Sequence, residues 1–357
     1  MLAPRAAALA LDLLPNGRRN GRFWETSSVD DVKTGKYSLK VNLSGANQGK
    51  WTDFAAAKGT AEYKGDMLSL VALRRFGGKN TEALRNAIAW AKSYLNLDDL
   101  DPARLATVRR EAAEKAVRHA EDADAEKAKK QRSAWALWRA AVSIGGTPAF
   151  SYLEGRGIDF KRLGRIPGAL RYRPDVWCPE RRAKHPAMIA CIMGLDGKLR
   201  GVHRTYLDIS RWSHATRKGP VGKAKVENAK LSLGPYAGGC IPLWKGACQK
   251  TLRDIDPGVA VFASEGLEDG LSVAIAKPEL RVVAGVALAN LGALELPPQA
   301  GPIVFIGQND TNPKTIDAFE RAIARQQEAG RKAQMFFPPP EFKDFNDQLM
   351  GKRRERA

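Results

Sequence analysis

Residues 259–272 have the sequence VAVFASEGLEDGLS, and this stretch decides the fold of the C-terminal part of the chain. Val259 to Ser264 is a short apolar run, which predicts a buried strand. Glu265 follows this run directly, and Asp269 stands one helical turn later, where Asp269 to Ala276 predicts a helix. Acidic side chains therefore stand at the point where a strand gives way to a helix.

The same alternation continues to residue 350. The further predicted elements are strands over Arg281 to Val286, Pro302 to Gly307 and Lys332 to Phe337, and a helix over Pro313 to Ala329. Strands that alternate with helices are typical of an α/β fold with a parallel, doubly wound sheet. We therefore expect residues 258–350 to form one domain of this class.

Carboxylates follow three of these strands. Glu265 follows the first strand, Asp310 follows the third, and Asp344 and Asp347 follow the last. Ligands bind beyond the carboxyl ends of the strands in an open parallel sheet. Clustered carboxylates repel one another unless a cation intervenes, so the set predicts a divalent metal site. The alternative is that these residues are helix caps, which suits Asp269 but not three separate strand ends.

Two further zones precede this domain. Residues 20–97 contain strand-like runs at Lys36 to Leu43 and Lys50 to Ala55, then a predicted helix over Met67 to Phe76 with Asp66 as its N-cap. Residues 98–144 are rich in Ala, Glu, Lys and Arg and predict one or two long connecting helices. A coiled-coil partner site is the alternative for this connector, although its Ala-rich apolar positions make a weak seam.

Residues 145–257 form a mixed α+β zone. A buried strand is predicted over Ala187 to Gly194, followed by a hairpin turn at Asp196 and Gly197 and a strand over Leu199 to Tyr206. Residues 155–230 hold 18 Lys or Arg against 6 Asp or Glu, in a chain whose net charge is +19. The aromatic residues among these bases are Tyr172, Trp177, Tyr206 and Trp212. Such mixing favours a groove for single-stranded nucleic acid over a merely solvated face.

The remaining composition excludes other classes. Met1 to Leu14 is too short and too interrupted to span a membrane, so we expect neither a membrane partner nor a signal peptide. Cys178, Cys191, Cys240 and Cys248 are scattered without a C-x-x-C pair, which predicts reduced thiols in a cytoplasmic protein and no zinc.

At its acidic motifs the chain resembles the Toprim family, in the form found in primases of phages, plasmids and integrated mobile elements. Ser264 to Ser272 resembles the first motif of the family, and Lys343 to Leu349 (KDFNDQL) is similar to its closing motif. Ile306 to Asp310 (IGQND) aligns with the Asp-x-Asp motif, but Gln308 stands at the first Asp. A neutral Gln binds Mg²⁺ less strongly than Asp does, because it offers only a carbonyl oxygen.

Weaker resemblances extend upstream. Tyr152 to Ile158 and Leu170 to Tyr172 look like the start of a primase core, and Gly201 to Leu207 continues that pattern. Residues 20–97 are similar to the zinc-ribbon module of such proteins but lack its Cys and His ligands. We therefore expect a zinc-ribbon-like, metal-free N-terminal domain before the basic primase-core subdomain and the Toprim domain.

The resemblance implies a primase-like nucleotidyltransferase that makes short RNA primers on single-stranded DNA. It implies Glu265 and Asp310 as catalytic residues, and Mg²⁺ or Mn²⁺, as one or two ions, on Glu265, Asp310, Asp344 and Asp347. The residues implied for nucleic acid or nucleotide are Arg156, Arg171, Arg204, Lys223, Lys225 and Lys343. The implied partners are single-stranded DNA, ribonucleoside triphosphates and a replicative helicase, in the cytoplasm of a bacterial or phage-infected cell. The alternatives are an inactive Toprim protein that only binds nucleic acid and a Toprim nuclease.

Overall fold

The computed structural model describes residues 2–33, 35, 37–45, 47–56, 63–96 and 102–354. The chain divides into two compact units, Met1–Glu126 and Lys127–Ala357. The boundary falls within α4, Pro102–Arg139, one continuous helix that crosses most of the predicted connector. Residues 97–101, at the start of the predicted connector, lie outside the described residues.

The first unit contains a five-stranded antiparallel sheet with strand order β1-β2-β3-β4-β5 and helices beside it. Its strands are Arg18–Asn20, Phe23–Thr26, Leu39–Asn42, Trp51–Asp53 and Lys64–Gly65. Its helices are η1 (Ala3–Arg5), α1 (Ala6–Leu13), α2 (Met67–Phe76) and α3 (Thr81–Tyr94). Asp66 caps α2 as predicted, since its side chain accepts a hydrogen bond from the backbone N–H of Ser69. The metal-free zinc-ribbon likeness of this unit stays a prediction.

The second unit begins with an antiparallel sheet of order β10-β9-β8-β7-β6, in which β11 also pairs with β9. The strands are β6 (Val142–Ser143), β7 (Leu170–Cys178), β8 (Ala183–Met193), β9 (Leu199–Asp208), β10 (Gly222–Lys223) and β11 (Lys230–Leu233). The short helix α5 (Pro148–Glu154) precedes β7. The predicted hairpin turn joins β8 to β9, where Gly197 has a φ of 75° that glycine adopts freely.

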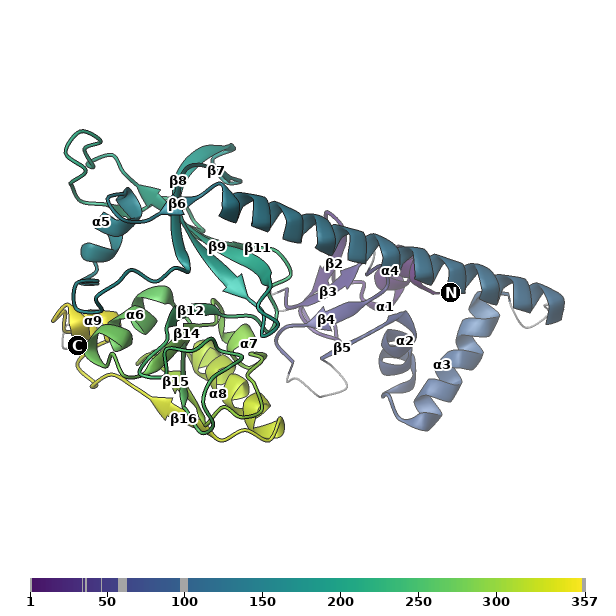
Figure 1. Ribbon diagram of the computed structural model, residues 1–357. Coiled ribbons are helices and arrows are strands. Elements are labelled where there is room, and N and C mark those ends of the chain that lie inside the picture. Colours follow the sequence, from purple (N-terminus) through teal and green to yellow (C-terminus); the bar gives the residue numbers. More distant parts are fainter. Residues whose placement is uncertain are drawn as a thin grey trace. The chain divides into compact units, whose positions relative to one another are not determined.

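The second sheet of this unit has the order β12-β14-β13-β15-β16. Figure 1 labels β12, β14, β15 and β16 of this sheet. Its strands are β12 (Ile241–Trp244), β13 (Val261–Ser264), β14 (Arg281–Ala284), β15 (Ile303–Ile306) and β16 (Ala333–Phe336). Its helices are α6 (Leu267–Ala276), α7 (Leu288–Leu291), α8 (Pro313–Glu328) and α9 (Phe345–Leu349). The four strands from β13 to β16 are parallel, as the alternation predicts, whereas β12 pairs with β14 antiparallel at the edge.

Successive side chains of these strands point to opposite faces of the sheet. Val282 belongs to a core cluster with Leu271 of α6, whereas Val283 belongs to a different cluster with Leu291 of α7 and Ala322 of α8. The sheet is therefore covered on both faces, which explains why its strands are continuous apolar runs. Because helices cover both faces of the sheet, a ligand can reach it at the carboxyl ends of β13 and β15.

Two other expectations concern the N-terminal segment and the cysteines. Within the described part, no helix is long and apolar enough to cross a bilayer. The four cysteines are free thiols, and Cys178, Cys191 and Cys240 are buried. Burial raises the pKa of both Cys191 and Cys240 to about 12, so these thiols stay protonated near neutral pH.

Candidate functional site

Glu265 is the first residue after β13, at the carboxyl end of that strand. α6 begins two residues later at Leu267. Gly270 lets α6 lie close against the sheet, because a Cβ at this position would stand 2.6 Å from Ser264 Oγ. The strand and helix thus hold Glu265, half-buried, at the edge where parallel sheets bind ligands.

The backbone beside Glu265 is strained. The N–H of Val286 donates a hydrogen bond to the carbonyl oxygen of Glu265 at 3.1 Å. Val286 has a φ of 61°, which is rare for a β-branched residue. Such a conformation costs on the order of 1–3 kcal/mol and is concentrated at functional sites. The hydrogen bond from Val286 holds its loop against the end of β13 at Glu265.

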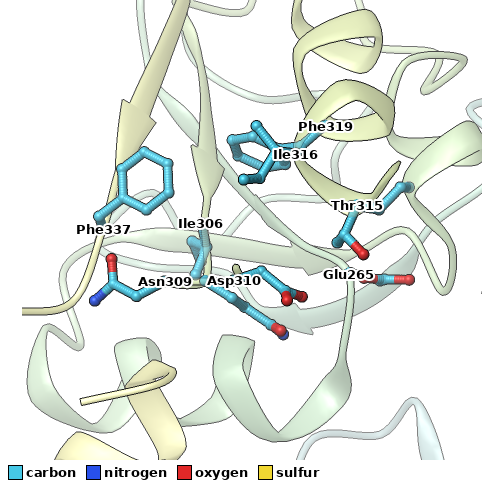
Figure 2. A pocket seen from close by; sticks show the side chains of 10 residues that line it. Glu265, Ile306, Asn309, Asp310, Thr315, Ile316, Phe319 and Phe337 are labelled. Atoms are coloured by element: carbon cyan, nitrogen blue, oxygen red, sulfur yellow. The ribbon is translucent and has the colours of Figure 1, made fainter. Parts of the chain in front are cut away.

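β15 is the neighbour of β13, and Gln308 and Asp310 follow its carboxyl end. Glu265, Gln308 and Asp310 line one cavity of about 260 Å³ with α8 above it (Figure 2). Gly307 precedes them, and a Cβ there would meet the ring of Phe337 at 2.4 Å. The glycine therefore lets this aromatic ring lie against the end of β15, where it forms part of the cavity wall.

The carboxyl group of Glu265 loses its proton less readily than that of an exposed Glu. Burial raises its pKa, and the negative charge of Asp310 raises the pKa further. The backbone N–H of Leu288 and the charge of Lys230 oppose this shift only in part. Two neighbouring carboxylates in a partly desolvated cavity favour a proton or a cation between them.

A second cavity, of about 490 Å³, opens on the other side of Glu265 and Gln308. Its polar lining includes His203, Lys230 and Ser232 from β9 and β11. Burial and the charge of Lys230 lower the pKa of His203 to about 4, so this imidazole is neutral at pH 7. The cavity is a polar cleft between the two sheets of the unit.

An ion pair between the partly buried Lys230 and the buried Glu268 lies in this region. Lys230 Nζ donates to Glu268 Oε2 at 2.8 Å, and the hydroxyl of Tyr152 donates to Glu268 Oε1 at 2.6 Å. Burial opposes ionisation of Glu268, but Lys230 and these hydrogen bonds outweigh it and lower the pKa to about 2. Glu268 is therefore a structural carboxylate that ties α6 to α5 and β11.

Asp269 has the opposite character. Its Oδ2 accepts a hydrogen bond from Gln308 Nε2 at 2.8 Å, and its Oδ1 accepts one from the backbone N–H of Asn346 at 3.1 Å. Burial and the nearby charge of Asp344 raise the pKa of Asp269 to about 7. One expectation was that Asp269 caps its own helix, and this expectation is wrong. Asp269 instead holds the first turn of α9 and the amide of Gln308.

The four carboxylates expected to share a metal are not gathered into one cluster. Within the described residues, no three His, Cys, Asp or Glu side chains are close enough to hold an ion by themselves. Asp344 is the N-cap of α9, where its Oδ1 accepts a hydrogen bond from the N–H of Asp347 at 2.7 Å. Neither Asp344 nor Asp347 lines the cavity of Glu265 and Asp310. Mg²⁺ often uses only one or two protein carboxylates together with substrate phosphates, and Glu265 and Asp310 fit that kind of site.

Some of the expected basic residues gather near the ion pair. Partial burial and the charge of Lys230 lower the pKa of Lys223, on which Glu268, Arg156 and Asp344 also act. Lys223 and Arg156 therefore lie in the same electrostatic neighbourhood as the polar cleft. Positive charge at this place can neutralise an incoming phosphate.

The other expected basic residues are placed differently. Arg171 donates to the carbonyl oxygen of Trp138 at 2.8 Å and stacks over its indole ring. Arg204 lies over the ring of Tyr206. Lys225 and Lys343 are exposed, the first after β10 and the second just before α9. The structure does not bring these four residues into the two cavities.

Parallel strands covered by helices, with carboxylates at their carboxyl ends, define a doubly wound α/β domain with an acidic edge. Residues 260–355 match the family described as the Toprim domain. The C-terminal part of this chain is a Toprim domain, which confirms the resemblance found in its motifs. Residues 128–243 match a domain of unknown function, DUF7146. The search of curated proteins gives no match.

The chain is also similar to solved structures that are described as primases. The chain is similar to the Aquifex aeolicus primase (zinc-binding and RNA polymerase domains), with 13% identity, a TM-score of 0.42, and coverage of 98% of this chain and 81% of that one. A DNA primase domain from Pseudomonas aeruginosa is 15% identical, with a TM-score of 0.41 and coverage of 63% and 75%. A DnaG primase catalytic domain bound to single-stranded DNA is 14% identical, with a TM-score of 0.42 and coverage of 64% and 76%.

Sequence reasoning missed Lys230 and Glu268 as a pair. Lys230 stood at the end of the basic region, and Glu268 stood inside the first motif, 38 residues away. The only available signal was an extra acid in the first turn of an apolar helix, a position that a solvent-exposed Glu also occupies. The pairing becomes evident only when β11 is seen beside α6.

Proposed function

We propose that this chain is a primase-like nucleotidyltransferase that joins ribonucleotides into short primers on single-stranded DNA. The observation that carries the proposal is the position of Glu265 at the end of β13 in a Toprim domain, between the cavity that it shares with Asp310 and the polar cleft that contains Lys230. The net charge of +19 suits a polyanionic template. Mobile-element replication and a replicative helicase as partner belong to this proposal.

The proposed reaction needs a base and a place for phosphate. The 3′-hydroxyl oxygen of one nucleotide attacks the α-phosphorus of the next, a P–O bond forms, and the P–O bond to pyrophosphate breaks. Glu265 accepts the hydroxyl proton, and its raised pKa suits this role because a general base works best when its pKa lies near the working pH. The departing pyrophosphate carries the negative charge away.

Basic residues of the second unit would hold the phosphates. In this proposal Lys223 and Arg156 neutralise the triphosphate. Glu265 and Asp310 would hold a divalent ion together with the substrate, and such an ion neutralises charge in phosphoryl transfer. Asp310 also keeps Glu265 basic through its negative charge. Arg171, Arg204, Lys225 and Lys343 remain proposed contacts to template outside the two cavities.

The test is primer synthesis with labelled ribonucleotides on single-stranded DNA, with Mg²⁺ or Mn²⁺ added. Glu265→Gln should abolish the product, because it removes the base and one charge of the acidic pair. Glu320→Gln, on the exposed face of α8, is the matched control and should synthesise primers normally. Cleavage of the template instead of synthesis, or binding without any product, would contradict the proposal.

A further inference from the structure

Arg281 is a buried arginine at the start of β14, and only 4% of its surface is exposed. Its Nη2 donates a hydrogen bond to the carbonyl oxygen of Lys250. Among the residues that the structure describes, its Nε is buried without an acceptor, and no carboxylate acts on its charge. A buried cation without an anionic partner is costly. The free Nε–H therefore marks a place for one more acceptor.

Cys248 lies beside this arginine, in the loop between β12 and β13. It packs against the core cluster that contains Val283, and Arg281 points to the same face of the sheet because it stands two residues before Val283. Burial lowers the pKa of Arg281, and the negative charge that Cys248 can carry opposes this shift. The backbone N–H of Lys250 donates to the carbonyl oxygen of Cys248 at 2.8 Å. Lys250 thus joins the cysteine and the arginine in one turn.

The thiol of Cys248 has a polar and partly open setting. Its Sγ–H donates a hydrogen bond to Oδ2 of Asp256 at 3.2 Å. The ammonium group of Lys250 donates to the other oxygen of the same carboxylate. Cys248 is partly exposed, whereas the other three cysteines are buried. A small solute can therefore reach this thiol more readily than the other three.

A sulfenic acid would satisfy these neighbours better than the thiol does. Sulfur is a weak acceptor, so the thiol serves Asp256 and gives little to the arginine. An oxygen atom added to the sulfur is both an acceptor and, through its O–H, a donor. It can accept from Nε of Arg281 and donate to Asp256 at the same time. The oxidised side chain thus supplies the acceptor that the buried guanidinium lacks.

We propose that Cys248 is a site of reversible oxidation by hydrogen peroxide, and that Arg281 holds the sulfenic acid that forms. The sulfur attacks one peroxide oxygen, so an S–O bond forms and the O–O bond breaks. The attacked oxygen keeps its proton, and the leaving hydroxide takes the thiol proton to become water. Sulfur loses the two electrons that the peroxide gains. Arg281 pairs with Val261 at the start of β13, whereas Glu265 follows the end of that strand, so this site is separate from the acidic pair.

The first experiment treats the reduced full chain with hydrogen peroxide and traps sulfenic acid with dimedone. Peptide mass spectrometry should find the adduct on Cys248 and not on the three buried cysteines. Dithiothreitol added before dimedone should prevent the label, because thiols convert a sulfenic acid back to the thiol. No adduct on Cys248, or equal labelling of all four cysteines, would overturn the proposal.

Variants of the arginine test its part in the oxidation. With dimedone in excess throughout, Arg281→Met should label Cys248 about tenfold more slowly, because loss of one hydrogen bond from a charged donor has that order of effect. Arg281→Lys keeps a charge but not the Nε donor, and it should restore the rate only in part. Arg253→Met removes an exposed charge from the same loop and is the matched control, with the parental rate expected. The parental rate in a folded Arg281→Met protein would contradict the role of the arginine.

Asp256→Asn tests the site without a change to the buried guanidinium, because Asp256 is partly exposed. A negative charge beside the sulfur disfavours the reactive thiolate, so its removal should raise the labelling rate of Cys248. Asp254→Asn, two residues away and exposed, is the control and should label at the parental rate. Circular dichroism checks the fold of each variant. Equal rates in Asp256→Asn and Asp254→Asn would overturn the proposed site even if the Arg281 variants do not fold.

Discussion

Gln308 donates a hydrogen bond from its side-chain amide to the carboxylate of Asp269, which joins the end of β15 to the first turn of α6 at 2.8 Å. An Asp at position 308 would repel the carboxylate of Asp269, whereas Gln308 forms a hydrogen bond with it. This hydrogen bond also commits one oxygen of Asp269 within the protein, while the N–H of Asn346 occupies the other. The acidic edge is thereby reduced to the pair Glu265 and Asp310.

Gln308→Asp should make the fold depend on divalent cations. The new carboxylate would stand beside Asp269 and Asp310, and like charges that close together destabilise the protein unless a cation binds. Thermal unfolding should show a lower Tm without metal and a rise with added Mg²⁺ or Mn²⁺ that exceeds the rise in the parent. Gln308→Asn adds no charge and should show no such rise. An equal response in the two variants would contradict the role assigned to Gln308.

Asp269 should make the protein less stable as the pH rises. Its pKa is about 7 in the folded protein and 3.8 in its ordinary state, so the folded form binds more protons between these values. Stability therefore falls as the pH rises from about 4 to 7, by on the order of 3–5 kcal/mol in total. Asp269→Asn should match the parent near pH 4 and unfold at higher denaturant concentration at pH 8. Asp317→Asn, exposed on α8, is the control and should leave the pH profile unchanged.

Removal of the charge of Lys230 should lower the free energy of unfolding. Lys230→Met would leave the buried carboxylate of Glu268 without its cation, which typically costs about 3–5 kcal/mol. The pKa of Glu268 is lowered to about 2, so the pair stabilises the protein above pH 4.5 and this contribution is lost as the pH falls toward 2.

Urea denaturation at pH 7 and pH 3 measures both effects of the Lys230 change. The double variant Lys230→Met with Glu268→Gln should recover part of the loss at pH 7. Lys184→Met breaks the exposed pair with Asp175 and should cost less than about 1 kcal/mol. A similarly small cost for Lys230→Met would show that the buried carboxylate of Glu268 does not depend on Lys230.

Gly270→Ala should push α6 away from the sheet. The added methyl group would stand 2.5 Å from Leu243 Cδ1 and 2.6 Å from Ser264 Oγ, and overpacking of this kind costs about 1–3 kcal/mol. Because Glu265 lies between β13 and α6, primer synthesis should fall as well. Gly168→Ala is the control, since a Cβ there meets nothing within 4 Å. Equal chemical denaturation midpoints for the two variants would argue against close packing at Gly270.

The strands β13, β14 and β15 were predictable because they are apolar runs buried on both faces. The proximity of Glu265 and Asp310 was predictable too, since β13 and β15 are parallel neighbours and each residue follows a strand end. Asp344 caps α9 and does not line the cavity of Glu265 and Asp310, so its role as a metal ligand stays a prediction. Asp347 stands three residues after Asp344, and this spacing in the sequence indicates a helix cap.

Other features depend on tertiary structure. β12 was missed because Ile241 to Trp244 is a short run interrupted by Pro242, and only its pairing with β14 makes it a strand. The predicted strand over Ala187 to Gly194 was too short, since β8 begins at Ala183 with polar residues that pair with β7. Residue types alone do not reveal such partners.

The position of β12 has a consequence for protein engineering. The match to DUF7146 ends at residue 243, inside this strand, and the Toprim match begins at residue 260. The upstream family thus donates the edge strand of the downstream sheet. A Toprim fragment cut at residue 258 would expose the unpaired backbone of β14 and invite aggregation. Any truncation that is meant to keep this sheet intact should therefore begin before Ile241.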